Sequence, residues 1–442
     1  MTLLAGEITL GLLLRFAAPT ILSFVFLNIY FVIDGIFVSR AVGTSGLAAV
    51  NLAMPLLNVM IALATMLSTG GSARIAALLG EKKTDEARKG FTFIVLSGVI
   101  FSAILTGLSF VFLEPLLGVL GADETLLALC KSYAVPLLIS QTFVMGGMLL
   151  DAFFIVEGRP ALSMLSGMIG GFINIALDYI FLFQWGMGIE GAAIATGIGY
   201  SFSALVGIAY FGFWRKGTLF FVRPVLCWHI LKKSLSNGIS EMVTMLSASI
   251  VMIAANNILM NLAGENGVAA FSIAQYAEEL LLSVYIGYAE GIAPLTSYNY
   301  GERNFANIRR IFRFSLGIIG CFGLMAFVLS FFIAEPVVAA FSEGNTAVFG
   351  IAVHGFSIFA IGFLFVGFNV YASSLFTALN DGRTSAVLSF CHTMVFLLGM
   401  LILLSHFFGI DGVWFAEPAA ELMAMLFGAW IVREKGKIYG LA

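Results

Sequence analysis

The chain consists mostly of apolar runs that are too long for the core of a soluble domain. A helix needs about 20 apolar residues to cross a bilayer, and windows of about that length predict twelve spans. They lie at 10–36, 47–79, 90–113, 125–155, 160–184, 190–214, 230–262, 267–299, 306–334, 345–379, 384–408 and 412–432. Strands of a membrane β-barrel would instead alternate over about 10 residues. We therefore expect an all-α polytopic membrane protein, with the lipid bilayer as a partner.

The two halves of the chain repeat one another at a constant offset of 221 residues, as from Gly43 to Gly264. The same offset relates Gly46/Gly267, Ala48/Ala269, Ala49/Ala270, Gly70/Gly291, Gly80/Gly301, Glu81/Glu302, Arg88/Arg309, Phe91/Phe312, Glu114/Glu335 and Pro115/Pro336. Because six is an even number, both copies enter the membrane in the same direction as parallel repeats. The prediction is a six-helix lobe at 1–214, a cytoplasmic linker at 215–229 and a second six-helix lobe at 230–442.

The placement of basic residues predicts the orientation. Every Lys and Arg except Arg40 and Lys131 lies after an even-numbered span or in a terminal region. Such segments face the cytoplasm, so we expect both termini there. The first apolar segment is too long for a cleavable signal and has a counterpart in the second half, so we expect it to be a span.

Composition excludes several classes of function. Charged residues make up 11% of the chain, against about 25% in soluble domains. The net charge of −3 gives no footprint for nucleic acid. The four cysteines are scattered without a CxxC pair. The Gly186-x-Gly188-x-x-Gly191 run joins two spans, so we interpret it as a turn and not as a dinucleotide site. No HExxH motif or nucleophile–base pair occurs, and we expect neither an enzyme nor a cofactor.

Parallel repeats point to transport. They place a substrate site between the halves, near the middle of the membrane, and transport proceeds as one half rocks against the other. The alternative is a membrane scaffold without a substrate.

Two aspartates within the first-half spans are the leading candidates for an ion site. Asp34 lies 19 residues beyond Arg15, and Asp178 lies 19 residues beyond Arg159, so both are about 28 Å from that end. Asn174 precedes Asp178 by four residues and shares its helix face. Thr196, five residues after Gly191, lies near the same depth. A charge at depth costs roughly 2.5–3.5 kcal/mol, which binding of a hard cation or a proton can offset. The alternative is that each acid caps a polar cavity or pairs with a neighbour; Asp151, for example, is predicted to pair with Arg159.

The second half carries a different set of acids. At the same offset, Gly399 takes the place of Asp178, so the ion site is not duplicated. Glu241 can line a cavity, or it can reach the interface, because it is close to Lys233. The other candidates for a cavity or an ion are Glu278, Glu279, Glu290, Glu417 and Glu421.

The chain resembles the multidrug and toxic compound extrusion (MATE) transporters over nearly its whole length. The resemblance rests on IDGIFVSRAVG, GSARIAALLGEKKTDEARKGF, VEGRPALSMLSGMIGGFINIALDYIF and APLTSYNYGERNFANIRR. It implies the fold of the MOP superfamily. The DinF-like branch uses an aspartate, an Asn-x-x-x-Asp pair and a threonine, which correspond to Asp34, Asn174, Asp178 and Thr196. The NorM-like branch relies on acids in spans 7 and 10, and span 10 here has none.

The resemblance implies export of lipophilic or cationic compounds in exchange for Na⁺ or H⁺, with Asp34 and Asp178 as the ligands of a Na⁺ ion if that is the coupling ion. Pro19 matches a proline tied to bending of span 1. The remaining candidates for the substrate cavity or a gate are Asn28, Tyr30, Glu241, Gln275, Glu278, Glu279 and Glu290. We expect a monomer in a prokaryotic plasma membrane. The alternatives are a flippase for lipids or lipid-linked oligosaccharides, against which the absence of basic residues at mid-membrane argues, or an exporter of a metabolite.

Overall fold

The computed structural model describes residues 4, 6–120, 124–341 and 345–441, and helices dominate this part of the chain. The helices of the first half are α1 (Leu10–Gly80), α2 (Thr84–Val111), α3 (Leu113–Val119), α4 (Glu124–Val156), α5 (Pro160–Asp178), η2 (Tyr179–Gln184) and α6 (Ile189–Phe213). Those of the second half are α7 (Trp228–Gly301), α8 (Phe305–Phe341), α9 (Thr346–Phe359), η3 (Ala360–Leu364), α10 (Val366–Ala378), α11 (Gly382–Phe390), η4 (Cys391–Leu397), α12 (Leu398–Phe408) and α13 (Ile410–Tyr439).

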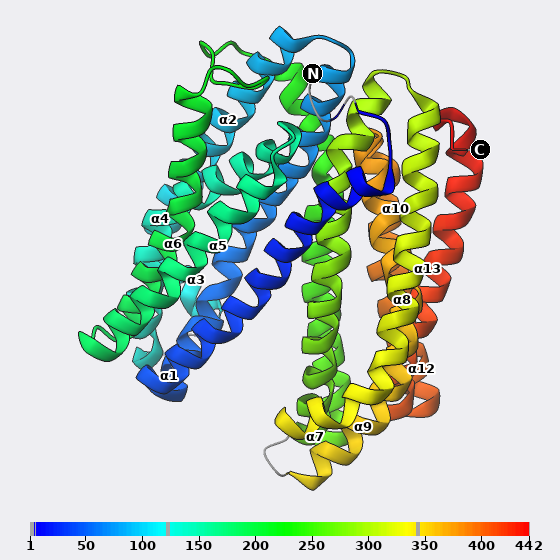
Figure 1. Ribbon diagram of the computed structural model, residues 1–442. Helices are drawn as coiled ribbons and strands as arrows, with labels where there is room; N and C mark the ends of the chain where they lie inside the picture. The colour runs from blue at the N-terminus through cyan, green and yellow to red at the C-terminus, as the bar shows by residue number, and fades with distance from the viewer. Residues whose placement is uncertain (1–3, 5, 121–123, 342–344, 442) are drawn as a thin grey trace.

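The helices form two bundles that meet at one end and diverge at the other (Figure 1). We call α1–α6 the first lobe and α7–α13 the second lobe. Eleven helical segments of the described chain are long and apolar enough to span a membrane. One of them, α7, has 74 residues and breaks at Gly264, so it supplies two crossings. The predicted all-α fold with twelve crossings is therefore confirmed.

The backbone repeats with the sequence. Gly43 interrupts α1 with φ of +78°, and its repeat partner Gly264 interrupts α7 with φ of +63°. These left-handed conformations carry no steric penalty in glycine. Lys82 and Arg303, also repeat partners, have φ values of +62° and +59° just after α1 and α7. The boundaries of the lobes at 214 and 230 stay a prediction.

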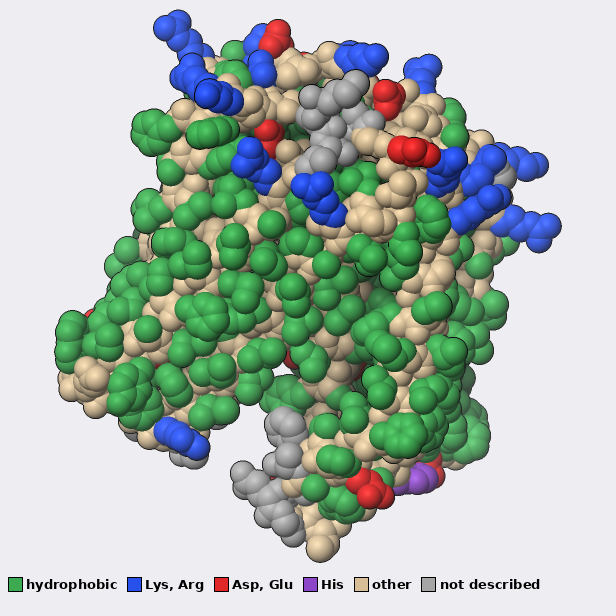
Figure 2. Space-filling view, viewed as in Figure 1, with side chains coloured by type: hydrophobic (Ala, Val, Ile, Leu, Met, Phe, Trp, Pro, Cys, Tyr) green, Lys and Arg blue, Asp and Glu red, His purple; other side chains and the backbone are tan. Residues whose placement is uncertain are grey.

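Lys and Arg side chains gather at the end where the lobes meet, which we call the basic face (Figure 2). The other end is hollowed by a cleft between the lobes. Hydrophobic side chains cover most of the flanks in this view, as expected where acyl chains replace water. Away from the basic face, Lys131 forms an ion pair with Glu114.

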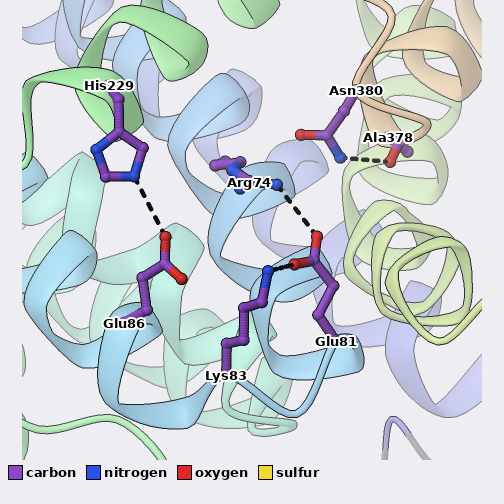
Figure 3. A network of polar contacts seen from close by, with 7 residues as sticks. All are labelled: Arg74, Glu81, Lys83, Glu86, His229, Ala378 and Asn380. Carbon is purple, nitrogen blue, oxygen red and sulfur yellow. Dashed lines mark hydrogen bonds and ion pairs between the residues drawn. The ribbon is translucent and has the colours of Figure 1, made fainter.

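Charged side chains surround the turn after α1 on the basic face (Figure 3). Glu81 contacts Arg74 at 3.4 Å and Lys83 at 2.7 Å. Partial burial opposes ionisation of Glu81, but the hydrogen bond from Lys83 and the charges of Lys83 and Arg74 outweigh it and lower the pKa of Glu81. His229, at the start of α7, contacts Glu86 of α2 at 3.2 Å. These contacts tie the beginning of the second lobe to the first.

Backbone contacts close the basic face. A Cβ atom added at Gly80 would lie 2.0 Å from the carbonyl oxygen of Tyr298. A Cβ atom added at Gly301 would lie 2.0 Å from that of Ala77. The two contacts are related by the repeat, because Gly80 matches Gly301 and Ala77 matches Tyr298. The lobes therefore touch backbone to backbone at this end, where no larger residue fits.

Candidate functional site

The first lobe brings the four predicted ion-site residues together. Asp34 comes from α1, Asn174 and Asp178 from α5, and Thr196 from α6. Asn174 Nδ2 donates a hydrogen bond to Thr196 Oγ1 at 3.3 Å. The carboxyl groups of Asp34 and Asp178 lie close enough for a proton to bridge them. The π-helical segment η2 begins directly after Asp178, and π turns within α-helices often mark functional sites.

This cluster is almost completely shielded from water. Asp178 is 0% exposed and Asn174 1%. Both carboxylate oxygens of Asp178, Oδ1 of Asp34 and Oδ1 of Asn174 are buried without a hydrogen-bond partner. Four acceptor oxygens without a donor are costly in an apolar interior. A bound proton or a small hard cation would satisfy them, because such cations prefer oxygen ligands.

Tyrosines surround this site, and two further predicted residues lie on α1. The rings of Tyr30 and Tyr200 stand edge to face with their centroids 6.5 Å apart, and Tyr30 is 4% exposed. Asn28 donates to the carbonyl oxygen of Phe24 on its own helix at 3.2 Å. Pro19 lies inside α1. Any role of Pro19, Asn28 or Tyr30 in gating stays a prediction.

The second lobe encloses a cavity of about 340 Å³ that is rich in acids. All five residues predicted from the second half for a cavity line it: Glu241, Gln275, Glu278, Glu279 and Glu290. Glu290 also reaches the first lobe, where Thr69 Oγ1 lies 3.5 Å from its Oε1. Thr69 and Glu290 are repeat partners, so this contact lies where the two lobes are related by the repeat. Of the two interpretations of Glu241, the structure favours the cavity over the interface with Lys233.

Sequence reasoning missed part of this cavity. His392 of η4 contacts Glu421 of α13 at 2.6 Å. Asn369 of α10 donates to Glu421 Oε2 at 2.6 Å and to its carbonyl oxygen at 2.9 Å. Glu417 and Glu421 were named as acids of one span, but His392 and Asn369 were not selected. The available signal was an E-x-x-x-E pattern in an apolar span, which places two acids on one face of α13.

One predicted pair is wrong. Asp151 of α4 accepts a hydrogen bond from Ser166 Oγ of α5 at 3.0 Å, and no ion pair with Arg159 occurs among the described residues. Asp151 therefore links two helices inside the first lobe and does not pair at the interface. Nor do the described residues contain a group of three or more His, Cys, Asp or Glu side chains that could hold a metal. A pair of carboxylates suits a monovalent cation or a proton.

The fold and these two sites define a polytopic helical membrane protein with buried acids in both of its repeated lobes. Comparison with known proteins gives the family. The MatE family model matches residues 19–180 and again residues 241–402, together more than half of the chain. The protein belongs to the MATE family, and the two matches correspond to the two repeats.

Relatives and solved structures agree. The chain is 23% identical to multidrug export protein MepA of Staphylococcus saprophyticus, over 96% of this chain and 94% of that protein. MepA of Staphylococcus aureus MRSA252 is likewise 23% identical, over 96% of this chain and 94% of that protein. A crystal structure of MATE in complex with MaL6 superposes with a TM-score of 0.94 at 25% identity, covering 100% of this chain and 99% of that one. An outward-facing multidrug resistance transporter of the MOP superfamily gives 0.93 at 25% identity, covering 99% and 98%.

Proposed function

We propose that this protein is a secondary active multidrug exporter that expels lipophilic or cationic compounds in exchange for Na⁺ or H⁺. The observation that carries the proposal is the set of four buried acceptor oxygens on Asp34, Asn174 and Asp178 that have no donor. An uncompensated carboxylate at this depth is expensive, and a coupling cation compensates it. The names of the relatives, which include multidrug export proteins, support the direction and class of transport.

In this proposal, Asp34 and Asp178 bind the ion, and Asn174 and Thr196 are neutral ligands. The ion enters through the cleft opposite the basic face, which is the outer side if Lys and Arg mark the cytoplasm. The structure then corresponds to an outward-open state. Exchange requires that the ion bind one state better than the other, because a ligand with equal affinity for both shifts nothing.

The test is accumulation of a lipophilic cationic dye in efflux-deficient cells that express the wild type, Asp34→Asn or an empty vector, with Na⁺ present and absent. The proposal expects only the wild type to lower accumulation. A Na⁺ requirement would identify the coupling ion as Na⁺, and its absence would favour H⁺. If the expressed wild type matched the empty vector with several such dyes, the exporter proposal would fail, and lipid flipping or metabolite export would be tested instead. The DinF-like placement within the family stays a prediction.

A further inference from the structure

A second proton site lies in the other lobe, away from Asp34 and Asp178. The carboxyl groups of Glu278 on α7 and Glu417 on α13 lie within hydrogen-bonding reach of each other. Two carboxylates repel, and a hydrogen bond between them requires that one carry a proton. Glu417 is 8% exposed and lines the cavity. Within the described chain, no donor hydrogen bond to its carboxylate is found, so a proton is the partner that its surroundings lack.

The surroundings of this pair favour a proton over an anion. Glu421, one turn from Glu417, is already satisfied by His392 and Asn369. The remaining titratable groups that line the cavity are Glu241, Glu279 and Glu290 of α7, and its lining includes no Lys or Arg. A surplus of carboxylates without a basic residue can be neutralised only by cations or protons.

A chain of hydroxyl groups leads from this cavity towards the basic face. Ser389 and Ser373 line the cavity, and their oxygens are 2.9 Å apart. Ser373 is also 2.9 Å from Ser385, and Thr377 donates to Ser385 at 2.8 Å. Ser240 lies a further 3.3 Å from Thr377. The chain joins helices α11, α10 and α7, which adjoin one another in the second lobe (Figure 1).

The inner part of the chain is dry and can change its direction. Ser385 and Ser240 are 0% exposed and Thr377 is 1% exposed. Ser385 can also donate to the carbonyl oxygen of Ser373 at 2.8 Å, so its hydroxyl has two alternative acceptors. A hydroxyl both donates and accepts, so it can take up a proton on its oxygen and pass on its own. The chain ends at Ser385, one helical turn from Asp381 at the start of α11.

We propose that the Glu278–Glu417 pair holds a proton and exchanges it with water at the basic face along Ser389, Ser373, Ser385 and Thr377. Uptake adds one proton and one positive charge to the pair, and release returns both to water, with no other bond changed. The route leaves the cavity on the side opposite to the cleft. The second lobe thus has its own proton site, independent of the site in the first lobe and built from different residue types.

The test uses infrared spectroscopy on the full chain in lipid, because a protonated carboxyl group has a carbonyl band that shifts when D₂O replaces H₂O. The background is Asp34→Asn with Asp178→Asn, which removes the acids of the first lobe. Glu417→Gln should lose a protonated-carboxyl band, since the amide then donates to Glu278 in place of the proton. Glu434→Gln, an exposed acid on the same helix, should keep it. If Glu417→Gln fails to fold, Glu278→Gln serves instead.

The hydroxyl chain is tested by the rate at which this band shifts in D₂O. Ser385→Ala should keep the band and slow the shift about tenfold, as expected from the loss of one hydrogen bond in the path. Ser357→Ala is the matched control, because Ser357 is exposed and donates only to its own helix. A Glu417→Gln spectrum equal to the background would overturn the proton site. An unchanged exchange rate in Ser385→Ala would overturn the route, and neither result would bear on drug export.

Discussion

At the scale of single residues, the costliest group in the first lobe is Asp178. Its side chain is 0% exposed, and neither of its carboxylate oxygens has a hydrogen-bond partner. A buried charge without compensation destabilises a fold by several kcal/mol. Such a residue persists when a ligand of the native state offsets the cost, and a ligand that binds only this state stabilises the protein by mass action.

Replacing Asp178 with Asn should therefore remove the effect of the ion on stability. We expect the wild type to gain about 2.7 kcal/mol when Na⁺ or H⁺ is raised to about 100 times its Kd. Asp178→Asn should melt at or above the ion-free wild type and gain nothing. The measurement is the melting temperature of purified protein against NaCl, with choline chloride for constant ionic strength, and against pH. Asp151→Asn, which removes a buried acid bonded to Ser166, should keep the gain; an undiminished gain in Asp178→Asn would exclude it as an ion ligand.

Asp381 connects three helix ends on the basic face and gives a pH-dependent prediction. It caps α11 through Thr384 and accepts hydrogen bonds from Lys435 at 3.1 Å and Tyr439 at 2.8 Å. Burial opposes its ionisation, but the bonds from Thr384, Tyr439 and Lys435 outweigh burial and lower the pKa of Asp381. A lowered pKa means that its stabilisation is complete above the ordinary value of about 3.9 and is lost as pH falls through the lower folded value.

Asp381→Asn should thus destabilise the protein by about 2 kcal/mol at neutral pH, the range for a hydrogen bond to a charged group. The difference from the wild type should persist down to about pH 5 and disappear only below the ordinary Asp pKa of about 3.9. Thermal unfolding at a series of pH values measures it. Asp85→Asn, whose side chain is 90% exposed, is the control. A difference that vanished already between pH 7 and pH 5 would contradict this account.

At the scale of helices, the close approach of α1 to α7 depends on glycine. The Cβ atom of any other residue at Gly80 would lie 2.0 Å from a backbone carbonyl oxygen, which no side-chain movement relieves. We expect Gly80→Val to hold the basic face open, to reduce export and to leave each lobe folded. Gly317→Val in α8 is the control, because nothing lies within 4 Å of a Cβ atom at that position.

The measurement for Gly80→Val is spin-label distance across the basic face, with one label on α2 and one on α8, together with dye export. The expected result is a longer distance than in the wild type and in Gly317→Val. A wild-type distance with normal export would show that the contact between Gly80 and Tyr298 does not control closure.

Helices and the first-lobe site were predictable because they depend on local counts. A bilayer of fixed thickness sets the length of each span, and a rise of 1.5 Å per residue sets the depth of Asp34 and Asp178. His392 was not predictable in this way. Its partner Glu421 belongs to another helix, and the π-helical segment η4 shifts the face that its residues present. Sequence periodicity assumes a regular helix and does not show that shift.

At the scale of the whole molecule, the cleft and the two polar sites fit one arrangement. The lobes meet at the basic face and separate at the other end (Figure 2). The cross-lobe contact of Thr69 with Glu290 lies between them. The repeat predicted this relation of the lobes, whereas the state of the cleft could not be predicted, since both states of an alternating transporter share one sequence.

The most direct test of ion-coupled export uses purified protein in vesicles loaded with a lipophilic cationic dye. An opposing gradient of Na⁺ or H⁺ is imposed, and dye movement is followed in the wild type, in Asp34→Asn and in the control Asp85→Asn. We predict that the wild type and Asp85→Asn move dye only when the gradient of the coupling ion is present, and that Asp34→Asn moves none in response to either gradient. Dye movement by Asp34→Asn at the wild-type rate, driven by the same gradient, would contradict the account.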